Sequence, residues 1–137
     1  MNNRKLPIGY WIKQVDKLLT DGIDSVQAQF GLARSDWQII HFLSEQPSVE
    51  TEKLLETMKP FMDSKVVEDI LTQLCSKGLV NIINNHSLAL TAKGKKQHAD
   101  CLERQKEFRQ TVMKDISEED YLKTIQTLQK IVDNIKV

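Results

Sequence analysis

Apolar residues recur at helical spacing along most of this chain. Between Leu6 and Phe30 they fall at positions 8, 11, 12, 15, 18, 19, 23, 26 and 30, which share one face of a 3.6-residue helix. Gly31 follows the last of these positions, and a glycine suits the left-handed residue that commonly ends a helix. The pattern therefore predicts one long amphipathic helix over residues 6–30.

Two shorter helices are predicted next. Ser35–Gln38 has the Ser-x-x-Gln form of a capping box, which predicts a helix start there, and Pro47 ends the apolar pattern that follows. Thr51 is expected to cap a second helix over Glu52–Met58, which cannot continue through Pro60.

The residues from Asp63 to Thr91 combine a helix with short β-prone runs. Asp63 is expected to cap the helix and Gly78 to end it. Its predicted buried face holds Val66, Val67, Ile70, Leu71 and Leu74. The runs Val80–Ile83 and Ser87–Thr91 follow, separated by Asn84-Asn85-His86. Because Asn tolerates left-handed backbone, these runs predict a tight hairpin.

Two more helices complete the chain. Thr91 is expected to cap a charged helix that runs to about Met113, and Ser117-x-x-Asp120 to begin the last one. The apolar face of the last helix comprises Tyr121, Leu122, Ile125, Leu128, Val132 and Ile135. The predicted fold class is mainly α with a small β-hairpin, in a single domain of residues 1–137.

The apolar faces of the first helix and the last two helices lie outside the central group of elements. A small unit cannot bury three such faces by itself, so we expect two copies to pair through them with two-fold symmetry. A monomer with these helices folded back is the alternative.

Composition narrows the choice of function. The 137 residues carry 19 basic and 19 acidic side chains, so any nucleic-acid surface has to be local. No apolar run is long enough to span a membrane and the N-terminus lacks a signal-peptide core, so we expect a cytoplasmic protein without membrane partners. Phosphate-loop and nucleophile-elbow motifs are absent from the sequence, which gives no support for an enzyme.

Three ordered motifs resemble the MarR family, the multiple-antibiotic-resistance type of winged-helix regulator. They are Gly31-Leu32-Ala33-Arg34-Ser35-Asp36-Trp37-Gln38, then Leu74-x-x-Lys77-Gly78-Leu79-Val80, then Leu88-x-Leu90-Thr91-x-x-Gly94. Two motifs, Gly9-Tyr10-Trp11 and Asp36-Trp37-Gln38, are similar to a short-wing branch of that family. The resemblance implies a winged helix-turn-helix core at about residues 32–91 and dimerisation helices at about 6–30 and 92–136. It also implies a homodimer that binds a pseudo-palindromic operator in double-stranded DNA, released in many members by a small aromatic or oxidising signal.

The resemblance assigns DNA contacts to the helix after Asp63, the hairpin tip and the preceding helix. The candidate residues are Lys53, Ser64, Lys65, Glu68, Asp69, Thr72, Asn84, Asn85 and His86. Two departures weaken this expectation: the tip lacks the family's arginine, and residues 48–77 hold four lysines against six acids. Glu68 or Asp69 can accept from a cytosine amino group, or this acidic face is solvated or contacts protein. Lys93, Lys95 and Lys96 after the hairpin are expected to compensate.

A second set of residues is expected to bind an effector between the first helix and the winged core. The set is Tyr10, Trp11, Val15, Trp37 and His41. For Trp37 and His41 the alternative is ordinary core packing. The second function hypothesis is accordingly a ligand-sensing or protein-interaction module with weak or no DNA binding.

Three further side chains carry chemistry of their own. His98 and Cys101 lie one turn apart, but nothing completes the four ligands of a structural zinc site, so no metal or cofactor is expected. Cys75 and Cys101 are redox-sensor candidates if their thiolates are stabilised; the alternative is a small, half-buried side chain.

Overall fold

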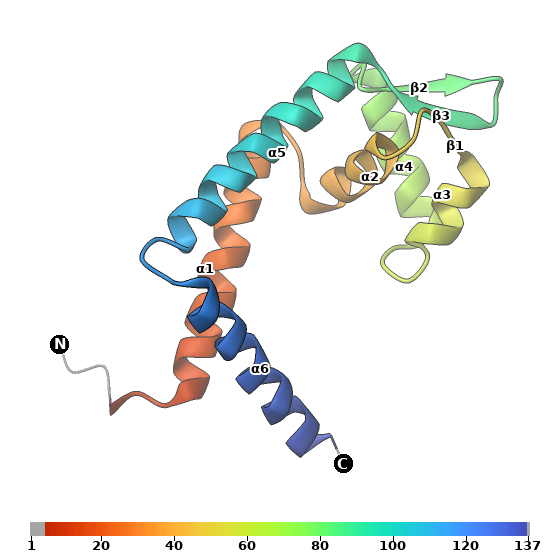
Figure 1. The fold of residues 1–137 in the computed structure, drawn as a ribbon. Coiled ribbons are helices and arrows are strands. Elements are labelled where there is room, and N and C mark those ends of the chain that lie inside the picture. The colour runs from red at the N-terminus through yellow and green to blue at the C-terminus, as the bar shows by residue number, and fades with distance from the viewer. Residues whose placement is uncertain (1–4, 137) are drawn as a thin grey trace. The chain divides into compact units, whose positions relative to one another are not determined.

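The computed structural model describes residues 5–136, and these form helices and short strands in a mainly α arrangement (Figure 1). The elements are α1 (Ile8–Gln29), α2 (Arg34–Ser44), β1 (Val49–Glu50), α3 (Thr51–Met58), α4 (Ser64–Ser76), β2 (Val80–Ile83), β3 (Ser87–Leu90), α5 (Ala92–Val112) and α6 (Glu118–Ile135). The predicted fold class is confirmed. The chain divides into two compact units, one ending at Gln105 and the other beginning at Lys106. A single domain of 1–137 stays a prediction, and residues 1–4 and 137 lie outside the described residues.

The first unit has one hydrophobic core. It is built from the start of α2 to the end of β3, with apolar faces of α2, α3 and α4 turned towards one face of the sheet. Its buried side chains are Leu32, Ile39, Ile40, Leu43, Val49, Leu54, Met58, Val67, Leu71, Leu74, Leu79, Val80, Leu88 and Leu90. Val66 was predicted among them but is 42% exposed, because the side of α4 that faces the core carries Val67, Leu71 and Leu74.

The predicted hairpin is confirmed. β2 and β3 pair antiparallel with Ile82 opposite Leu88, and the connection holds Asn84 and Asn85 at φ values of 53° and 65°. Left-handed backbone at two consecutive residues is the requirement of a type I′ turn, and Asn meets it at low steric cost. The amide of His86 closes the turn on the carbonyl oxygen of Ile83 at 3.3 Å.

Sequence reasoning missed a third strand. β1 adds to the free edge of β3, which gives a three-stranded antiparallel sheet in the order β1-β3-β2. Val49 lies opposite Leu88. Thr51 extends this edge by donating its amide to the carbonyl oxygen of His86 at 2.9 Å, so it is the first residue of α3 and not its cap.

Gly78 ends α4 as predicted. Its φ is +75°, its amide donates to the carbonyl of Cys75, and the amide of Leu79 donates to the carbonyl of Leu74, both at 3.0 Å. This hydrogen-bond pair is the Schellman arrangement, which satisfies carbonyls that the helix end leaves free. Leu74 and Leu79 are both buried, so the helix stop also places an apolar contact in the core.

The predicted helix starts are partly right. Thr91 and Ser117 accept hydrogen bonds from the amides of Gly94 and Asp120 at 2.9 and 3.0 Å, which confirms both caps. Asp63 occupies the cap position of α4, but its side chain makes no capping bond.

The Ser35 capping box is wrong, because the cap position of α2 lies two residues earlier. The cap position is Ala33, whose amide donates to the carboxylate of Asp36 at 2.8 Å. A carboxylate in the first turn also favours the positive end of the helix dipole. Asp36 therefore stabilises the start of α2 from a position within its first turn, and Ser35 does not act as the cap.

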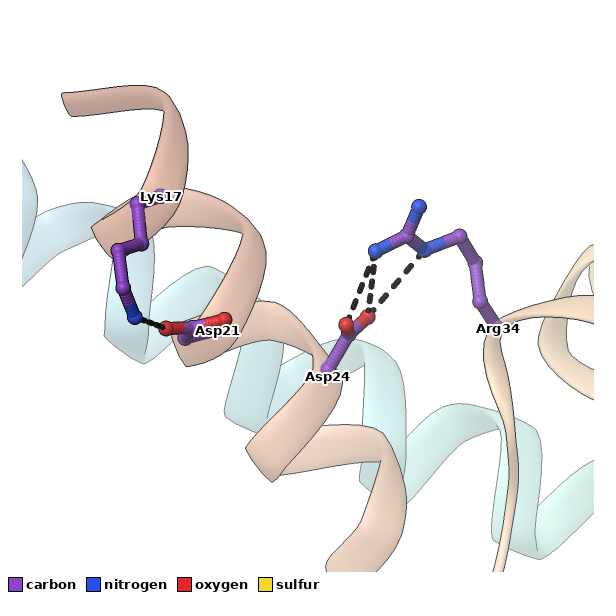
Figure 2. A network of polar contacts seen from close by, with 4 residues as sticks. All are labelled: Lys17, Asp21, Asp24 and Arg34. Atoms are coloured by element: carbon purple, nitrogen blue, oxygen red, sulfur yellow. Dashed lines mark hydrogen bonds and ion pairs between the residues drawn. The ribbon is translucent and has the colours of Figure 1, made fainter. Parts of the chain in front are cut away.

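An ion pair links α1 to the start of α2 (Figure 2). The guanidinium of Arg34 donates to both carboxylate oxygens of Asp24, with the shortest distance 2.9 Å. Lys17 and Asp21 form a second pair, one turn apart on α1, at 2.6 Å. Because all four side chains are well exposed, these contacts fix geometry more than they add stability.

Large apolar side chains remain exposed on both long amphipathic helices. On α1 they are Ile8, Tyr10, Trp11, Ile12, Val15, Leu18 and Leu19. On α6 they are Tyr121, Leu122, Ile125, Val132 and Ile135, and α6 has no buried residue among those described. Single exposed apolar residues are ordinary on a protein surface, but contiguous apolar faces of this kind mark contact surfaces.

Gly94 provides a test of the packing at the start of α5. A Cβ at this position would lie 2.1 Å from the carbonyl oxygen of Leu79, a backbone atom that cannot rotate away. We expect Gly94→Ala to lower the free energy of unfolding by about 3 kcal/mol, the upper range for overpacking. Urea denaturation followed by circular dichroism measures this change.

Gly9→Ala is the matched control. No atom lies within 4 Å of a Cβ built at Gly9, which sits in the first turn of α1. Alanine there is expected to raise stability by about 0.5 kcal/mol, because glycine is a poorer helix former. Equal effects of the two substitutions would contradict the close contact at Gly94.

Candidate nucleic-acid interface and effector site

The exposed face of α4 carries the residues predicted to read DNA. Ser64, Lys65, Glu68, Asp69 and Thr72 are all exposed, while the opposite face of the helix is buried in the core. Ser64 and Lys65 lie in the first turn, where free backbone amides also favour a phosphate group. The structure therefore brings the predicted α4 residues together on one accessible surface.

Charge on this face is internally balanced. The ammonium group of Lys65 lies 3.3 Å from the carboxylate of Asp69, one turn along the helix. The two side chains are 80% and 61% exposed, so the pair is weak and free to exchange partners. Thr72 donates its hydroxyl to the carbonyl oxygen of Glu68 at 3.0 Å. The face consequently presents no excess of positive charge.

The hairpin tip and α3 supply the other candidates. Asn84, Asn85 and His86 are exposed at the tip, and Lys53 is exposed on α3. Sequence reasoning missed the exposed apolar side chain next to the tip: Ile82 is 61% exposed although it lies opposite the buried Leu88. Its strand period indicated an inward side chain, but the core ends before the tip.

The lysines expected to compensate for the acids have different surroundings. Lys93 donates to the carbonyl oxygen of Lys77 at 3.1 Å, and Lys96 pairs with Asp100 at 2.9 Å. Lys95 instead lines a cavity with His98. Part of the positive charge after the hairpin is therefore already engaged.

The predicted effector residues fall into two separate ring clusters. Tyr10 and Trp11 meet edge to face, with ring centroids 5.0 Å apart, near the start of α1. Trp37 and His41 lie on α2, and both contact His98 of α5, a residue that sequence reasoning did not include in this set. Val15 is 52% exposed on α1. Within one copy of the chain, the described ring contacts do not join the two clusters.

The two histidines form a hydrogen-bonded imidazole pair. Nδ1 of His41 lies 3.0 Å from Nε2 of His98, with ring centroids 5.3 Å apart and planes within 23°. These values place the rings edge to edge in nearly one plane. The indole of Trp37 is almost parallel to both rings, at 8° and 16°, and the tryptophan also packs against the core.

This arrangement has a defined protonation chemistry. One ring nitrogen of the pair must donate while the other accepts, so the bond requires at least one neutral imidazole. Burial, followed by the charge of His41, lowers the pKa of His98 from its ordinary value of 6.5. His98 is therefore held neutral to lower pH than a solvated histidine.

The cysteines do not have the character of redox sensors. Burial raises the pKa of the Cys75 thiol, and it raises that of Cys101 against a smaller opposite effect from the Gln105 hydrogen bond. A raised pKa lowers the fraction of reactive thiolate, which is the opposite of what the redox hypothesis requires. Among residues 5–136, no group of three or more His, Cys, Asp or Glu side chains is placed to hold a metal ion.

Comparison with known proteins identifies the class of fold. No protein-family model matches this sequence, and no curated protein sequence matches it. Solved structures do match this chain. MepR, a transcription regulator of the Staphylococcus aureus multidrug efflux pump MepA, superposes with a TM-score of 0.75 at 17% identity over 95% of this chain and 99% of its own.

Two further solved structures agree. A MarR family protein of Mycobacterium tuberculosis, solved in complex with DNA, gives a TM-score of 0.68 at 17% identity, over 93% of this chain and 98% of its own. CouR of Rhodococcus jostii, bound to p-coumaroyl-CoA, gives 0.66 at 20% identity, over 96% and 95%. This chain has the winged-helix fold of the MarR-type transcription regulators. None of the helices described between residues 5 and 136 is long and apolar enough to cross a membrane.

The imidazole pair generates a prediction about pH. Because the folded-state pKa of His98 lies below its unfolded value, the unfolded chain binds this proton first as the pH falls. The resulting stability is fully present above about pH 6.5 and is lost as the pH falls through the folded-state pKa. Titration of the His98 ring protons by NMR is expected to give a value below that of a histidine in a short peptide.

His41→Gln separates the two causes. It removes the positive charge but leaves His98 half-buried, so we expect the pKa of His98 to rise while remaining below the peptide value. A wild-type His98 pKa equal to that of a histidine in a short peptide would contradict the described environment.

Proposed function

We propose that this protein is a homodimeric, DNA-binding transcription regulator that acts in the cytoplasm without a cofactor and is not an enzyme. In the proposed complex each α4 enters a major groove and the β2–β3 hairpin contacts the flanking backbone. The observation that carries the proposal is the joint exposure of the α4 candidates and the hairpin tip on a winged-helix core. The M. tuberculosis protein of the same fold, solved with DNA, supports this mode of binding.

The homodimer is proposed from the apolar faces of α1 and α6. Each face holds several large side chains that one copy of the chain leaves exposed. Because a two-fold axis brings identical surfaces together, these faces can cover one another in a second copy. Two reading helices would then address half-sites about one helical turn apart, as in other dimeric regulators.

We further propose release from DNA by a small aromatic effector. CouR was solved with p-coumaroyl-CoA and NadR with 4-hydroxyphenylacetate, and both ligands carry an aromatic ring. In this chain the aromatic side chains of Tyr10, Trp11, Trp37 and His41, together with Val15, are the proposed contacts. Their ring contacts within one chain form two separate clusters, so an effector that touches all five side chains would have to join these clusters.

The second candidate function is a winged-helix module that senses a ligand or binds a protein but binds DNA weakly or not at all. The Lys65–Asp69 pair favours it, because an acid on the reading face offsets the lysine nearest the expected phosphates. Phosphate neutralisation supplies most non-specific affinity for DNA, so a balanced face lowers that affinity.

DNA binding is tested by titrating the native promoter region against salt. Lys65→Ala is expected to weaken binding and to reduce the slope of log K against log salt by about 0.9, the value for one lost phosphate contact. Asp69→Asn is expected to tighten binding, because it frees Lys65 and removes a negative charge. Fluorescence anisotropy measures both.

Lys123→Ala on α6 is the control for charge alone, and its slope should match that of the wild type. If the wild type forms no complex with promoter DNA at low salt, the regulator proposal fails and the second candidate is favoured.

The dimer is tested on α6. The double substitution Ile125→Glu and Val132→Glu places charges on the exposed apolar face, and sedimentation at micromolar concentration should then show a single copy. Lys130→Glu lies on the polar side of the same helix and should leave the dimer intact. A wild-type protein that sediments as a monomer would contradict the homodimer.

A further inference from the structure

Two large apolar side chains are exposed at the start of α4, away from the apolar faces of α1 and α6. Phe61 is 66% exposed in the turn before the helix, and Val66 is 42% exposed in its first turn. Neither belongs to the hydrophobic core cluster or to the residues packed against it. In the sequence they flank Ser64 and Lys65, two of the residues proposed to contact DNA.

The backbone of the α3–α4 turn fixes the position of Phe61. The carbonyl oxygen of Met58 accepts the amides of Phe61 and Met62, at 2.8 and 2.9 Å. Met62 and Val67 occupy the two positions of a hydrophobic staple, one residue before the cap position Asp63 and four after it, and both pack in the core. Met62 thus takes the inward position, and Phe61, one residue earlier, is left in solvent.

Helical period explains the exposure of Val66. The buried face of α4 carries Val67, Leu71 and Leu74, and consecutive helical residues differ by about 100° around the axis. Val66 lies three residues before Asp69, so the two side chains are neighbours on the exposed side of the helix. A β-branched side chain in a helix has one strongly preferred rotamer, so Val66 loses little conformational freedom when it makes a contact.

The surroundings of the two side chains favour a base edge over a protein surface. Ser64, Lys65 and Asp69 lie beside them and are exposed, and covering these polar groups with a protein would remove their hydration. A base edge in the major groove offers hydrogen-bond partners to polar side chains and, at thymine, a methyl group to an apolar one. Two apolar side chains also cover much less than the roughly 800 Å² that each partner buries in a stable protein interface.

The charge distribution gives a second argument. Lys65 lies 3.3 Å from Asp69, so the exposed face of α4 offers little ionic affinity for phosphate. The hairpin adds none, because residues 78–92 include no lysine, arginine, aspartate or glutamate. Recognition of DNA by α4 and the hairpin therefore depends mainly on uncharged contacts.

We propose that Phe61 and Val66 contact the C5-methyl groups of thymines in the major groove, so that each operator half-site presents thymines to the start of α4. The N-terminal residues of a helix in the major groove are those that reach the base edges, and apolar side chains recognise the thymine methyl. This inference rests on the proposed DNA binding and adds to it the base that the operator must contain.

The test compares two forms of the native promoter region. One form contains thymine, and the other has uracil at every thymine position, which removes only the methyl group. The wild type is expected to bind the uracil form about fourfold more weakly for each methyl that a side chain covers, and about tenfold or more weakly when both copies of a dimer lose one. Fluorescence anisotropy measures the ratio of the two affinities, and the salt slope should be the same for both forms.

The double substitution Phe61→Ala and Val66→Ala tests the two residues. It should weaken binding to the thymine form and bring the thymine-to-uracil ratio close to one. Both side chains are exposed and alanine is the best helix former, so the fold is expected to persist, as circular dichroism checks. Phe61→Leu keeps an apolar side chain and should retain most of the ratio. Phe61→Ala alone lies outside the helix and gives the same test if the double variant does not fold.

Two controls separate this contact from others. Ile83→Ala removes an exposed apolar side chain from the hairpin and should leave the thymine-to-uracil ratio at its wild-type value. Lys65→Ala should lower the salt slope but leave the ratio unchanged, because the phosphates are the same in both forms of the DNA.

The possible results distinguish this inference from the regulator proposal. Equal binding of the wild type to both forms would overturn the thymine contact and leave the regulator proposal intact. A double variant that keeps the wild-type ratio would overturn the role of Phe61 and Val66, and is the result expected if these side chains contact a protein instead. If the wild type binds neither form at low salt, the regulator proposal and this inference fail together.

Discussion

Helix α4, the β2–β3 hairpin and α5 meet at the backbone of Leu79. Its amide closes the end of α4 on Leu74, and its carbonyl accepts the amide of Thr91 at 3.0 Å. The hydroxyl of Thr91 donates to the carbonyl of Gly78 at 2.6 Å and accepts the amide of Gly94. Gly94 can approach the carbonyl oxygen of Leu79 only because it has no side chain. These hydrogen bonds fix α4 relative to the sheet and to the first turn of α5, so the orientation of the exposed face of α4 depends on them.

The charged groups of this winged-helix unit are largely balanced or engaged locally. Its formal net charge is zero, and the exposed face of α4 holds its own counter-charge in the Lys65–Asp69 pair. Positive groups are placed singly instead: Lys93 on a carbonyl, Lys96 on Asp100, and Lys95 beside His98 in a cavity without acids. The proposal of DNA binding therefore rests on shape and on the fold more than on positive charge.

Local signals in the sequence were enough for most of the fold. Asn84 and Asn85 predicted the turn because few other residues adopt left-handed backbone cheaply, and Gly78, Thr91 and Ser117 marked helix ends through their own chemistry. The strand β1 was not predictable, since it spans two residues and exists only through pairing with β3. The start of α2 was misplaced because Asp36 and Ser35 are both plausible capping residues, and only the backbone decides between them.

The candidate site was predicted less completely, because its chemistry depends on long-range contacts. The α4 residues came from the family resemblance, and helical period gave the face on which they lie. His41 and His98 are 57 positions apart, and no spacing rule connects two histidines on different helices. The sequence also could not predict that Tyr10 and Trp11 make ring contacts separate from those of Trp37. Both groups lie at apolar positions of predicted helices, and a sequence does not give the distances between such positions.

The counter-charge on α4 has a consequence for how the proposed regulator would search a genome. A lysine that already has a carboxylate partner releases fewer condensed ions when it meets a phosphate, so random DNA would hold the protein only weakly. Time spent on wrong sequences would be short, and travel between sites would proceed through solution more than by sliding along the duplex. Discrimination would then come from the few contacts that only a matching sequence can complete, with little background affinity to mask them.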